Sequence, residues 1–378
     1  MSKIADLIKE ECPNGVEYKR LNDVVSVNRG SRLTKSQLNE NGKYEVYHGS
    51  KDTPLGLYDN FNTKGDTVIV VNTGGIGGVK YLENDFWCSD GSFNISHCTE
   101  LNNKFLYHFL QQYEGYFQQQ KRVGGVPTID KQIVEKIKIP VPPLEIQEEI
   151  VMILDEFSAL EAELEAELEA RKNQYEFWRD NLLNKEGKLY KLKELAHYST
   201  DRIKFDELDE NNYVGVDNLL QNKLGRKIAN YIPKTGNSTK FENGDILIGN
   251  IRPYLKKIWL SDITGGTNGD VLTIKVIDKN IIEPRYLYYI LSSDDFFNYD
   301  NQNSKGVKMP RGDKQMIMQY EFLVPSIDKQ EKIIMILDKF DRLINDISEG
   351  LPAEIELRKQ QYEYYRNKLL CFEEFNNE

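Results

Sequence analysis

The sequence of 378 residues has only four cysteines, only four histidines and no long apolar run. No stretch approaches the ~18 apolar residues that a membrane-spanning helix needs. The first fifteen residues carry acids and lack the apolar core of a signal peptide. The cysteines are far apart and include no Cys-x-x-Cys pair, which argues against a disulfide framework or structural zinc. We therefore expect a cytoplasmic protein that makes no membrane contact.

Sequence motifs that carry catalysis are also missing. There is no GxxxxGK[ST] phosphate loop, no HExxH or other metal-ligand spacing of histidines, and no Asn/Asp-Pro-Pro-aromatic motif for amino-group methylation. The glycine-rich stretch 73–78 has no helix signature or distal acid after it, so we interpret it as a tight turn. Glu17-Tyr18-Lys19 has the spacing of half a nuclease site but lacks a partner acid. We expect neither catalysis nor a bound cofactor in this chain.

Basic charge is scarce overall, since the net charge is −11, but the deficit is local. Residues 141–186 hold 4 basic and 13 acidic side chains, and residues 324–378 hold 8 and 12. Residues 1–140 hold 17 of each, and residues 187–323 hold 20 basic and 18 acidic. The excess acid therefore lies in two segments, and the other two segments are neutral to slightly basic. The net charge does not exclude nucleic acid as a partner of those two.

The chain repeats itself. Ile139–Phe157 and Phe322–Phe340 are identical at ten of nineteen positions, at an offset of 183 residues. Ala170–Leu183 and Leu357–Leu370 are identical at eight of fourteen. Shorter matches, such as Asp-Lys-Gln at 130–132 and at 313–315, occur in the same order between these segments. The order of the matches indicates a tandem duplication, each half being a globular unit followed by a long acidic helix.

The globular halves have the pattern of mixed, β-rich domains. Short apolar and β-branched runs bounded by turn residues predict strands at 67–71, 245–249 and 271–276. Apolar residues at helical spacing predict one helix per half, at 103–112 and 285–292. We expect an α+β fold in which two pseudo-symmetric β-rich domains are separated by two long, antiparallel coiled-coil helices. The predicted boundaries are 1–19 for an N-terminal segment, then 20–140, 141–186, 187–323 and 324–378.

The acidic segments carry a heptad pattern that follows a proline-containing exit from each globular half. The first predicts a helix over 146–183, and the second contains four extra residues around Gly350-Leu351-Pro352, where we expect a break or kink. Two such helices in one chain most simply pair with each other. The residues expected at helix-pairing positions are Ile150, Leu154, Phe157, Leu164, Leu168, Tyr175, Trp178, Ile333, Leu337, Phe340, Ile344, Ile347 and Tyr362.

The motif PxPPLxxQExI…ILD-aromatic, followed by a helix ending RKxQYExxRxxLL, resembles the specificity subunit of type I restriction–modification enzymes. The resemblance covers essentially the whole chain, because both parts are present twice. It implies that 20–140 and 187–323 are target recognition domains, each reading half of a bipartite DNA sequence. It also implies partnership with double-stranded DNA, two methyltransferase subunits and two restriction/translocase subunits. S-adenosylmethionine, ATP and magnesium would then bind in those partner subunits.

Basic and amide side chains grouped with glycine turns are the candidates for contact with DNA, because arginine pairs with guanine, and asparagine or glutamine with adenine. Any single lysine or arginine could instead be an ordinary solvated surface charge. The candidates are Arg29, Ser31, Arg32, His48, Ser50, Lys51, Lys121 and Arg122 in the first half, and Arg226, Lys227, Asn250, Arg252, Lys256, Lys257, Lys305, Lys308 and Arg311 in the second.

Two other functions remain open from the sequence. A coiled-coil adaptor whose β-rich ends bind proteins would suit the negative net charge, although the charge partition weakens that argument. A nuclease that uses the lone ExK triplet would require metal-dependent cleavage by the isolated chain.

Overall fold

The computed structural model describes residues 2–375 except 97, 123–124, 184 and 347. The chain packs as two compact units. Unit 1 contains Met1–Glu163 and Ile355–Glu378, and unit 2 contains Leu164–Glu354. Each unit therefore combines one β-rich domain with helical segments from both repeats of the sequence.

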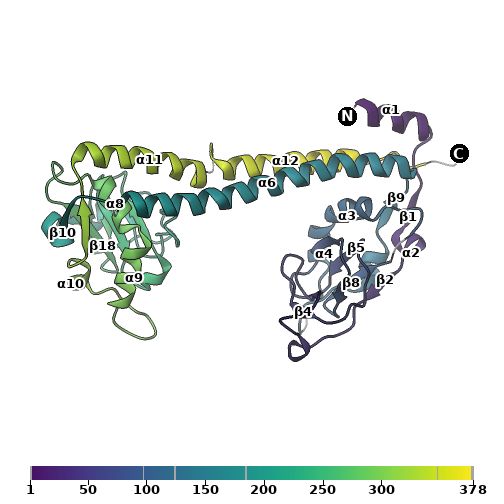
Figure 1. Cartoon of the computed structure of the whole chain (residues 1–378), viewed down its shortest axis with the longest axis horizontal. Coiled ribbons are helices and arrows are strands. Elements are labelled where there is room, and N and C mark those ends of the chain that lie inside the picture. The colour runs from purple at the N-terminus through teal and green to yellow at the C-terminus, as the bar shows by residue number, and fades with distance from the viewer. Residues whose placement is uncertain (1, 97, 123–124, 184, 347, 376–378) are drawn as a thin grey trace. The chain divides into compact units, whose positions relative to one another are not determined.

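Unit 1 is built around an antiparallel sheet with the strand order β2-β8-β5-β6. Its central strand β5 (Thr67–Val71) is buried along its whole length, which suits its β-branched sequence. Helix α3 (Asn103–Gln111) packs against β5 and β6 (Figure 1). The remaining elements are α1 (Ser2–Glu11), β1 (Tyr18–Arg20), α2 (Leu21–Val24), β2 (Val27–Arg29), η1 (Lys35–Gln37), β3 (Tyr44–Tyr47), β4 (Gly56–Tyr58), β6 (Val79–Leu82), β7 (Trp87–Cys88), β8 (Ser92–Ile95), α4 (Glu114–Gln119), α5 (Lys131–Glu135) and β9 (Lys138–Pro140).

Unit 2 repeats this plan with the strand order β11-β18-β15-β16, again antiparallel. Helix α8 (Pro284–Leu291) takes the place of α3 and buries one apolar face. The remaining elements are β10 (Lys188–Lys191), α7 (Leu192–Leu195), β11 (Ala196–Tyr198), β12 (Arg202–Lys204), η2 (Phe205–Glu207), β13 (Tyr213–Val214), β14 (Asn237–Phe241), β15 (Ile246–Gly249), η3 (Pro253–Leu255), β16 (Ile258–Leu260), β17 (Gly265–Thr267), β18 (Val271–Val276), α9 (Asp294–Gln302), α10 (Lys314–Ile317) and β19 (Glu321–Val324).

Smaller sheets repeat as well. The two-stranded sheet β1-β9 of unit 1 corresponds to β10-β19 of unit 2, and both lead into a long helix. Each unit also has a second sheet, β4-β3-β7 or β12-β14-β17-β13, that contains one parallel pair. The predicted α+β fold with two related β-rich domains is confirmed.

A buried glutamine explains why the exit motif is repeated. Gln147 and Gln330 are both 0% exposed. The Gln147 amide donates to the carbonyls of Glu100 (2.9 Å) and Pro142 (2.8 Å), and its oxygen accepts from the Asn102 N–H at 2.8 Å. The Gln330 amide makes the same three bonds, at 2.9 Å each, to the equivalent backbone groups of unit 2. In both units the glutamine joins the long helix to the loop before α3 or α8.

The long helices pair antiparallel within each unit. The first is α6 (Leu144–Leu183), close to the predicted span. In unit 1 the rings of Phe157 and Tyr365 stack at 5.2 Å, and in unit 2 the ring centroids of Tyr175 and Phe340 lie 6.2 Å apart. Leu183, near the end of α6, shares the core of unit 2 with Ile333 and Leu337, which precede Phe340 in the second repeat. Within unit 1, Lys359 Nζ also lies 3.5 Å from Glu161 Oε1. In each unit, a later residue of α6 thus meets an earlier residue of the second repeat, so the antiparallel pairing is confirmed.

The second repeat is broken into α11 (Ile327–Asn345) and α12 (Leu351–Leu369), as the insertion predicts. Pro352 lies in the first turn of α12, where a missing N–H is tolerated. Gly350 is packed so closely that a Cβ there would lie 2.6 Å from the carbonyl oxygens of Arg342 and Asp346. The break between α11 and α12 is therefore closely packed.

Tyr362 of α12 lies in a buried polar network of unit 1. Its hydroxyl donates to Gln111 Oε1 at 2.5 Å and lies 2.8 Å from Nδ1 of His108, whose Nε2 is 2.9 Å from the carboxylate of Asp155. His108 is only 1% exposed. The network joins α3, α6 and α12.

One helix-pairing residue lies elsewhere than expected. Trp178 is 44% exposed and packs edge-on against Phe177, whereas its neighbour Arg179 is 2% exposed and lies over the Tyr175 ring. A straight α-helix drifts about 20° per heptad from a 3.5-residue repeat, and this drift brings Arg179 onto the packed face. Ile347 lies outside the described residues. The other expected helix-pairing residues are buried or partly buried.

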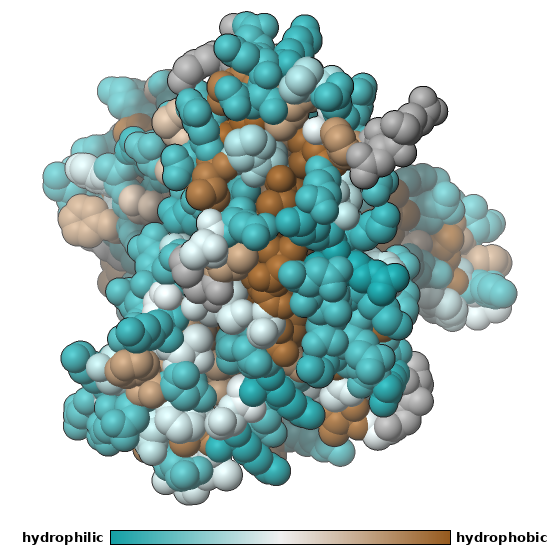
Figure 2. Space-filling view, turned by 90° about the vertical axis from the view of Figure 1, so that its right-hand side faces the viewer, coloured by the Kyte–Doolittle hydropathy of each residue, from teal (hydrophilic) through white to brown (hydrophobic). Residues whose placement is uncertain are grey.

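Polar residues predominate on the face of the molecule shown in Figure 2. Hydrophilic side chains cover most of this face, and apolar ones gather in a narrow central strip. The mean hydropathy of the chain is −0.58. Among the described residues, no helix combines the length and apolar character needed to cross a bilayer.

Candidate nucleic-acid interface

Loops from four parts of unit 1 and from three parts of unit 2 meet where the central strand ends. After β5, Asn72 donates its N–H to the Gly91 carbonyl (3.0 Å) and accepts from the Ile129 N–H (3.0 Å). After β15, Asn250 makes equivalent bonds to Asp270 (2.8 Å) and Gly312 (3.1 Å). We name these regions the loop clusters. They comprise residues 48–53, 72–78, 88–91 and 125–130 in unit 1, and residues 250–257, 268–270 and 304–312 in unit 2.

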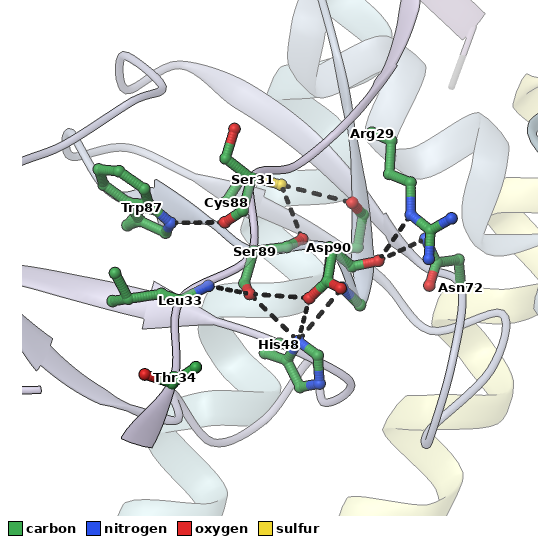
Figure 3. Close-up of polar contacts among 12 residues, drawn as sticks. Arg29, Ser31, Leu33, Thr34, His48, Asn72, Trp87, Cys88, Ser89 and Asp90 are labelled. Atoms are coloured by element: carbon green, nitrogen blue, oxygen red, sulfur yellow. Dashed lines mark hydrogen bonds and ion pairs between the residues drawn. The ribbon is translucent and has the colours of Figure 1, made fainter. Parts of the chain in front are cut away.

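His48 lies in the loop cluster of unit 1, against the turn before β8 (Figure 3). The Gly91 N–H donates to its Nδ1 at 3.2 Å, and Ser89 Oγ and the Asp90 carboxylate lie 3.2 and 3.3 Å from the same atom. Because Nδ1 accepts this bond, the neutral ring carries its proton on Nε2. Nε2 is then a donor that forms no hydrogen bond with the described residues.

Arg29 and Asn72 hold the same turn from the other side. Arg29 Nε and Asn72 Nδ2 both donate to the Asp90 carbonyl, at 3.0 and 3.2 Å (Figure 3). The Arg29 side chain is exposed, so its remaining guanidinium N–H groups face solvent. The Ser31 backbone is fixed by bonds to the Cys88 carbonyl and the Trp87 indole, which leaves its exposed hydroxyl available.

Ser50, Lys51 and Lys121 line one open depression of about 530 Å³ beside the glycine turn 74–78. Lys51 Nζ donates to both carboxylate oxygens of Glu114, at 2.7 and 2.8 Å, so its charge is largely neutralised. The Gly75 N–H donates to the Gly49 carbonyl at 2.8 Å, which holds the two loops together. The glycine-rich stretch is thus a tight turn packed against backbone, as expected.

Four left-handed residues shape the corresponding region of unit 2. The φ angles are 55° at Asn222, 66° at Lys223, 54° at Arg252 and 49° at Lys256, a conformation that non-glycine residues rarely adopt. Lys223 and Lys256 both donate to Asp294 Oδ1, at 2.7 and 2.9 Å. Burial opposes ionisation of this carboxylate, but the two lysines outweigh it and lower the pKa of Asp294 to about 2. The ion pairs with Asp294 therefore help to hold Lys223 and Lys256 in this unfavourable backbone conformation.

Several candidate side chains in unit 2 support the loops instead of facing solvent. Arg226 lies over the Trp259 ring at 4.8 Å and donates to the Asn211 carbonyl. Lys257 donates to the Val216 carbonyl at 2.6 Å, and burial lowers its pKa. Asn250 is 5% exposed, so its amide lies below the surface and cannot face a base in this conformation. Sequence alone did not separate these supporting roles from contact.

A buried carboxyl lies beneath the same loops. Asp300 of α9 is 1% exposed, and neither of its carboxylate oxygens has a hydrogen-bond partner among the described residues. The same is true of Asn250 Oδ1. A Cβ on Gly312 would lie 2.4 Å from Asp300 Oδ1 and 2.8 Å from Asn250 Oδ1, so a larger residue there would displace these two side chains. Burial raises the pKa of Asp300 to about 7.

The remaining candidates divide by their ion pairs. Arg122 pairs with Asp130, Lys305 with Asp313 at 2.5 Å, and Arg311 with Asp270 at 3.1 Å. The following exposed side chains form no hydrogen bond or ion pair with the described part of the chain: Arg32, Lys121, Lys227, Arg252 and Lys308.

Sequence reasoning missed the exposed aliphatic residues of the loop clusters. Val126 is 75% exposed, Val307 103% and Met309 50%. The internal repeat could have identified them, because Val126-Pro127 and Met309-Pro310 lie at the same distance before the matched Asp-Lys-Gln segments. Among the described residues, no group of three or more His, Cys, Asp or Glu side chains could hold a metal ion.

Comparison with known proteins accounts for the duplicated architecture. The family model of the type I restriction modification DNA specificity domain matches the sequence twice, at residues 13–170 and at residues 184–357. A type I restriction enzyme specificity subunit of Escherichia coli is 30% identical over 362 residues, covering 88% of this chain and 83% of its own. A putative type I restriction enzyme specificity subunit of Haemophilus influenzae is 28% identical and covers 94% and 96%.

Solved structures share the fold. The S subunit of a type I restriction-modification system from M. genitalium superposes with a TM-score of 0.59 at 17% identity, covering 94% of this chain and 96% of its own. A chain from a structural study of complex assembly and conformational transition in the type I R-M system gives 0.60 at 13% identity, covering 95% and 98%. With its two matched domains and near-complete overlap with these relatives, the chain belongs to the family of type I restriction–modification DNA specificity subunits.

Proposed function

We propose that this specificity subunit recognises a bipartite double-stranded DNA sequence, one half with the loop cluster of each unit. The observation that carries the proposal is the duplication of the loop cluster, which ends the same strand of the same sheet in both units. Exposed basic side chains lie in or beside both clusters, where they can reach phosphates and base edges. Two equivalent recognition sites suit a DNA target that has two parts.

The acidic helices suit a connector that does not itself bind DNA. Residues 141–186 carry 13 acidic side chains against 4 basic ones, so phosphate is repelled there. Helix α6 is continuous over 40 residues, or ~60 Å at 1.5 Å per residue. In this proposal the helical connector sets the number of unread bases between the two halves of the target.

The chemistry of the complex is assigned to other chains. Two methyltransferase subunits and two restriction/translocase subunits join this cytoplasmic subunit, which directs them to its target and performs no catalysis. S-adenosylmethionine, ATP and magnesium bind in those partners. The absence of phosphate-loop and methylation motifs from the sequence supports this division, as does the structural similarity to a chain from a study of type I complex assembly.

Methylome sequencing tests the proposal. A host expressing this chain with its methyltransferase subunits should acquire methylation at a motif of two defined parts and an undefined spacer. Replacement of residues 20–140 by another recognition domain should change one part and leave the other part and the spacer unchanged. A single undivided motif, or loss of both parts in a folded chimera, would contradict independent reading. A mobility shift with random duplex at low salt separates DNA binding from a protein adaptor, which would give none.

A further inference from the structure

Residues 305–311 form a closed loop anchored to the rest of unit 2. Lys305 and Arg311 exchange both backbone hydrogen bonds, at 2.8 and 2.9 Å. The Arg252 N–H donates to the Pro310 carbonyl at 2.7 Å, and Gly312 is bonded to Asn250 as described above. In Figure 1 these residues lie in the loop that follows α9. The base of the loop is therefore fixed, and its tip is presented to solvent.

The tip of this loop is aliphatic. Val307 is 103% exposed, and Met309 is 50% exposed. Lys308 lies between them without a side-chain partner among the described residues. Isolated exposed apolar residues are common and need no functional explanation. The exposed tip calls for a functional explanation only if the same arrangement is found in the other unit.

It recurs in unit 1. Arg122 and Thr128 form the corresponding bridge, and the Arg122–Asp130 ion pair corresponds to Lys305–Asp313. Val126 precedes Pro127 there as Met309 precedes Pro310, and Val126 is 75% exposed. Both copies of the domain thus expose an aliphatic residue just before the proline of the anchored loop.

The surroundings of the tip indicate what it contacts. In the loop of unit 2, Lys308 has no acidic partner among the described residues and would draw an anionic polymer toward the tip. Lys305 and Arg311 are paired with Asp313 and Asp270. An aliphatic side chain gains nothing from phosphate, but it packs on thymine methyl groups and can enter between base steps. The proline fixes the backbone beside the aliphatic residue, which reduces the ordering cost of such insertion.

We propose that Val126 in unit 1, and Val307 with Met309 in unit 2, are apolar wedges that pack against the bases of the bound duplex and partly unstack a base step. The proposal rests on the proposed function and deepens it. It assigns part of the reading to hydrophobic contact with bases, beside the polar contacts of the basic and amide side chains.

The test uses the complex with methyltransferase subunits and a duplex containing the motif found by methylome sequencing. Val307→Ala/Met309→Ala should lower affinity about tenfold or more, the scale of burying an aliphatic side chain. The slope of log affinity against log salt should not change, because no phosphate contact is lost. Lys308→Gln should instead reduce that slope by about one. Ile277→Ala, at a 57% exposed aliphatic residue of the same unit outside the loop cluster, is the matched control and should change neither.

A second readout is independent of affinity. A duplex with 2-aminopurine placed in turn along the unit 2 half-site should brighten at one step with the unaltered complex, and this brightening should be lost with Val307→Ala/Met309→Ala. Unchanged affinity and unchanged fluorescence in a variant with the normal melting temperature would overturn the wedge. If the unaltered complex shows no sequence-specific binding, the proposed function itself fails, which is a different result.

Discussion

The buried carboxyl of Asp300 gives a prediction about stability and pH. Its pKa is raised from 3.8 to about 7 by burial, and its carboxylate finds no hydrogen-bond donor among the described residues. The folded chain therefore retains a proton that the unfolded chain loses near pH 4. The contribution of Asp300 to stability should fall as the pH rises from about 4 to about 7 and level off above that. At ~1.4 kcal/mol per pH unit, a shift of about three units corresponds to at most ~4 kcal/mol.

Asp300→Asn removes the charge while keeping the shape of the side chain. We expect little difference from the unaltered chain at pH 4 and a gain of up to ~4 kcal/mol at pH 8, since the penalty for burying a charge is then absent. Urea denaturation at a series of pH values, followed by circular dichroism and by tryptophan fluorescence, measures the difference. Two of the three tryptophans, Trp178 and Trp259, lie in unit 2. Asp295→Asn, at an exposed position of the same helix, is the matched control and should give no comparable gain. A gain for Asp300→Asn that is equal at pH 4 and pH 8, or a loss at pH 8, would refute the reasoning.

Three further predictions concern the helices. Gln330→Leu leaves one N–H and two carbonyls without their buried partner, so the free energy of unfolding should fall by several kcal/mol at ~1–3 kcal/mol per unsatisfied group; a loss below 1 kcal/mol in urea denaturation would contradict this. Tyr362→Phe should lower the melting temperature because its hydroxyl bonds are lost, whereas Tyr175→Phe, whose hydroxyl forms no hydrogen bond with the described residues, should have little effect. Removal of one heptad from both α6 and α12 shortens the connector by ~10.5 Å, about three base pairs but also ~100° of duplex twist. Methylome sequencing should then show slow methylation at a shorter-spaced motif or none, since twisting DNA costs a few kcal/mol; the original spacing at full rate would mean that the helices do not set it.

The architecture could be predicted because it depends on periodic and repeated signals. Heptads, proline exits and an internal duplication identified α6, the break before α12 and the β-rich halves. Trp178 was misplaced because a 3.5-residue pattern says nothing about where a straight helix drifts off it. The residues that contact DNA were harder to predict from one sequence. Lys257 donates to a carbonyl and Lys308 lies in solvent, yet a sequence does not distinguish the two lysines. Their difference depends on tertiary neighbours far away in the chain.

The position of α12 in the chain has a consequence for synthesis. Tyr362, Leu369 and Leu370 belong to the same hydrophobic core as Ile150 and Leu154 of α6, and Val16 pairs with Glu374. Yet the ribosome makes the part of α12 that belongs to unit 1, from Ile355 onward, only after the whole of unit 2. A nascent chain can therefore complete unit 2 while unit 1 still exposes the apolar face that α12 will cover. During that interval unit 1 is the part most in need of a chaperone, and a chain cut off before α12 would lose the half whose β-rich domain was synthesised first.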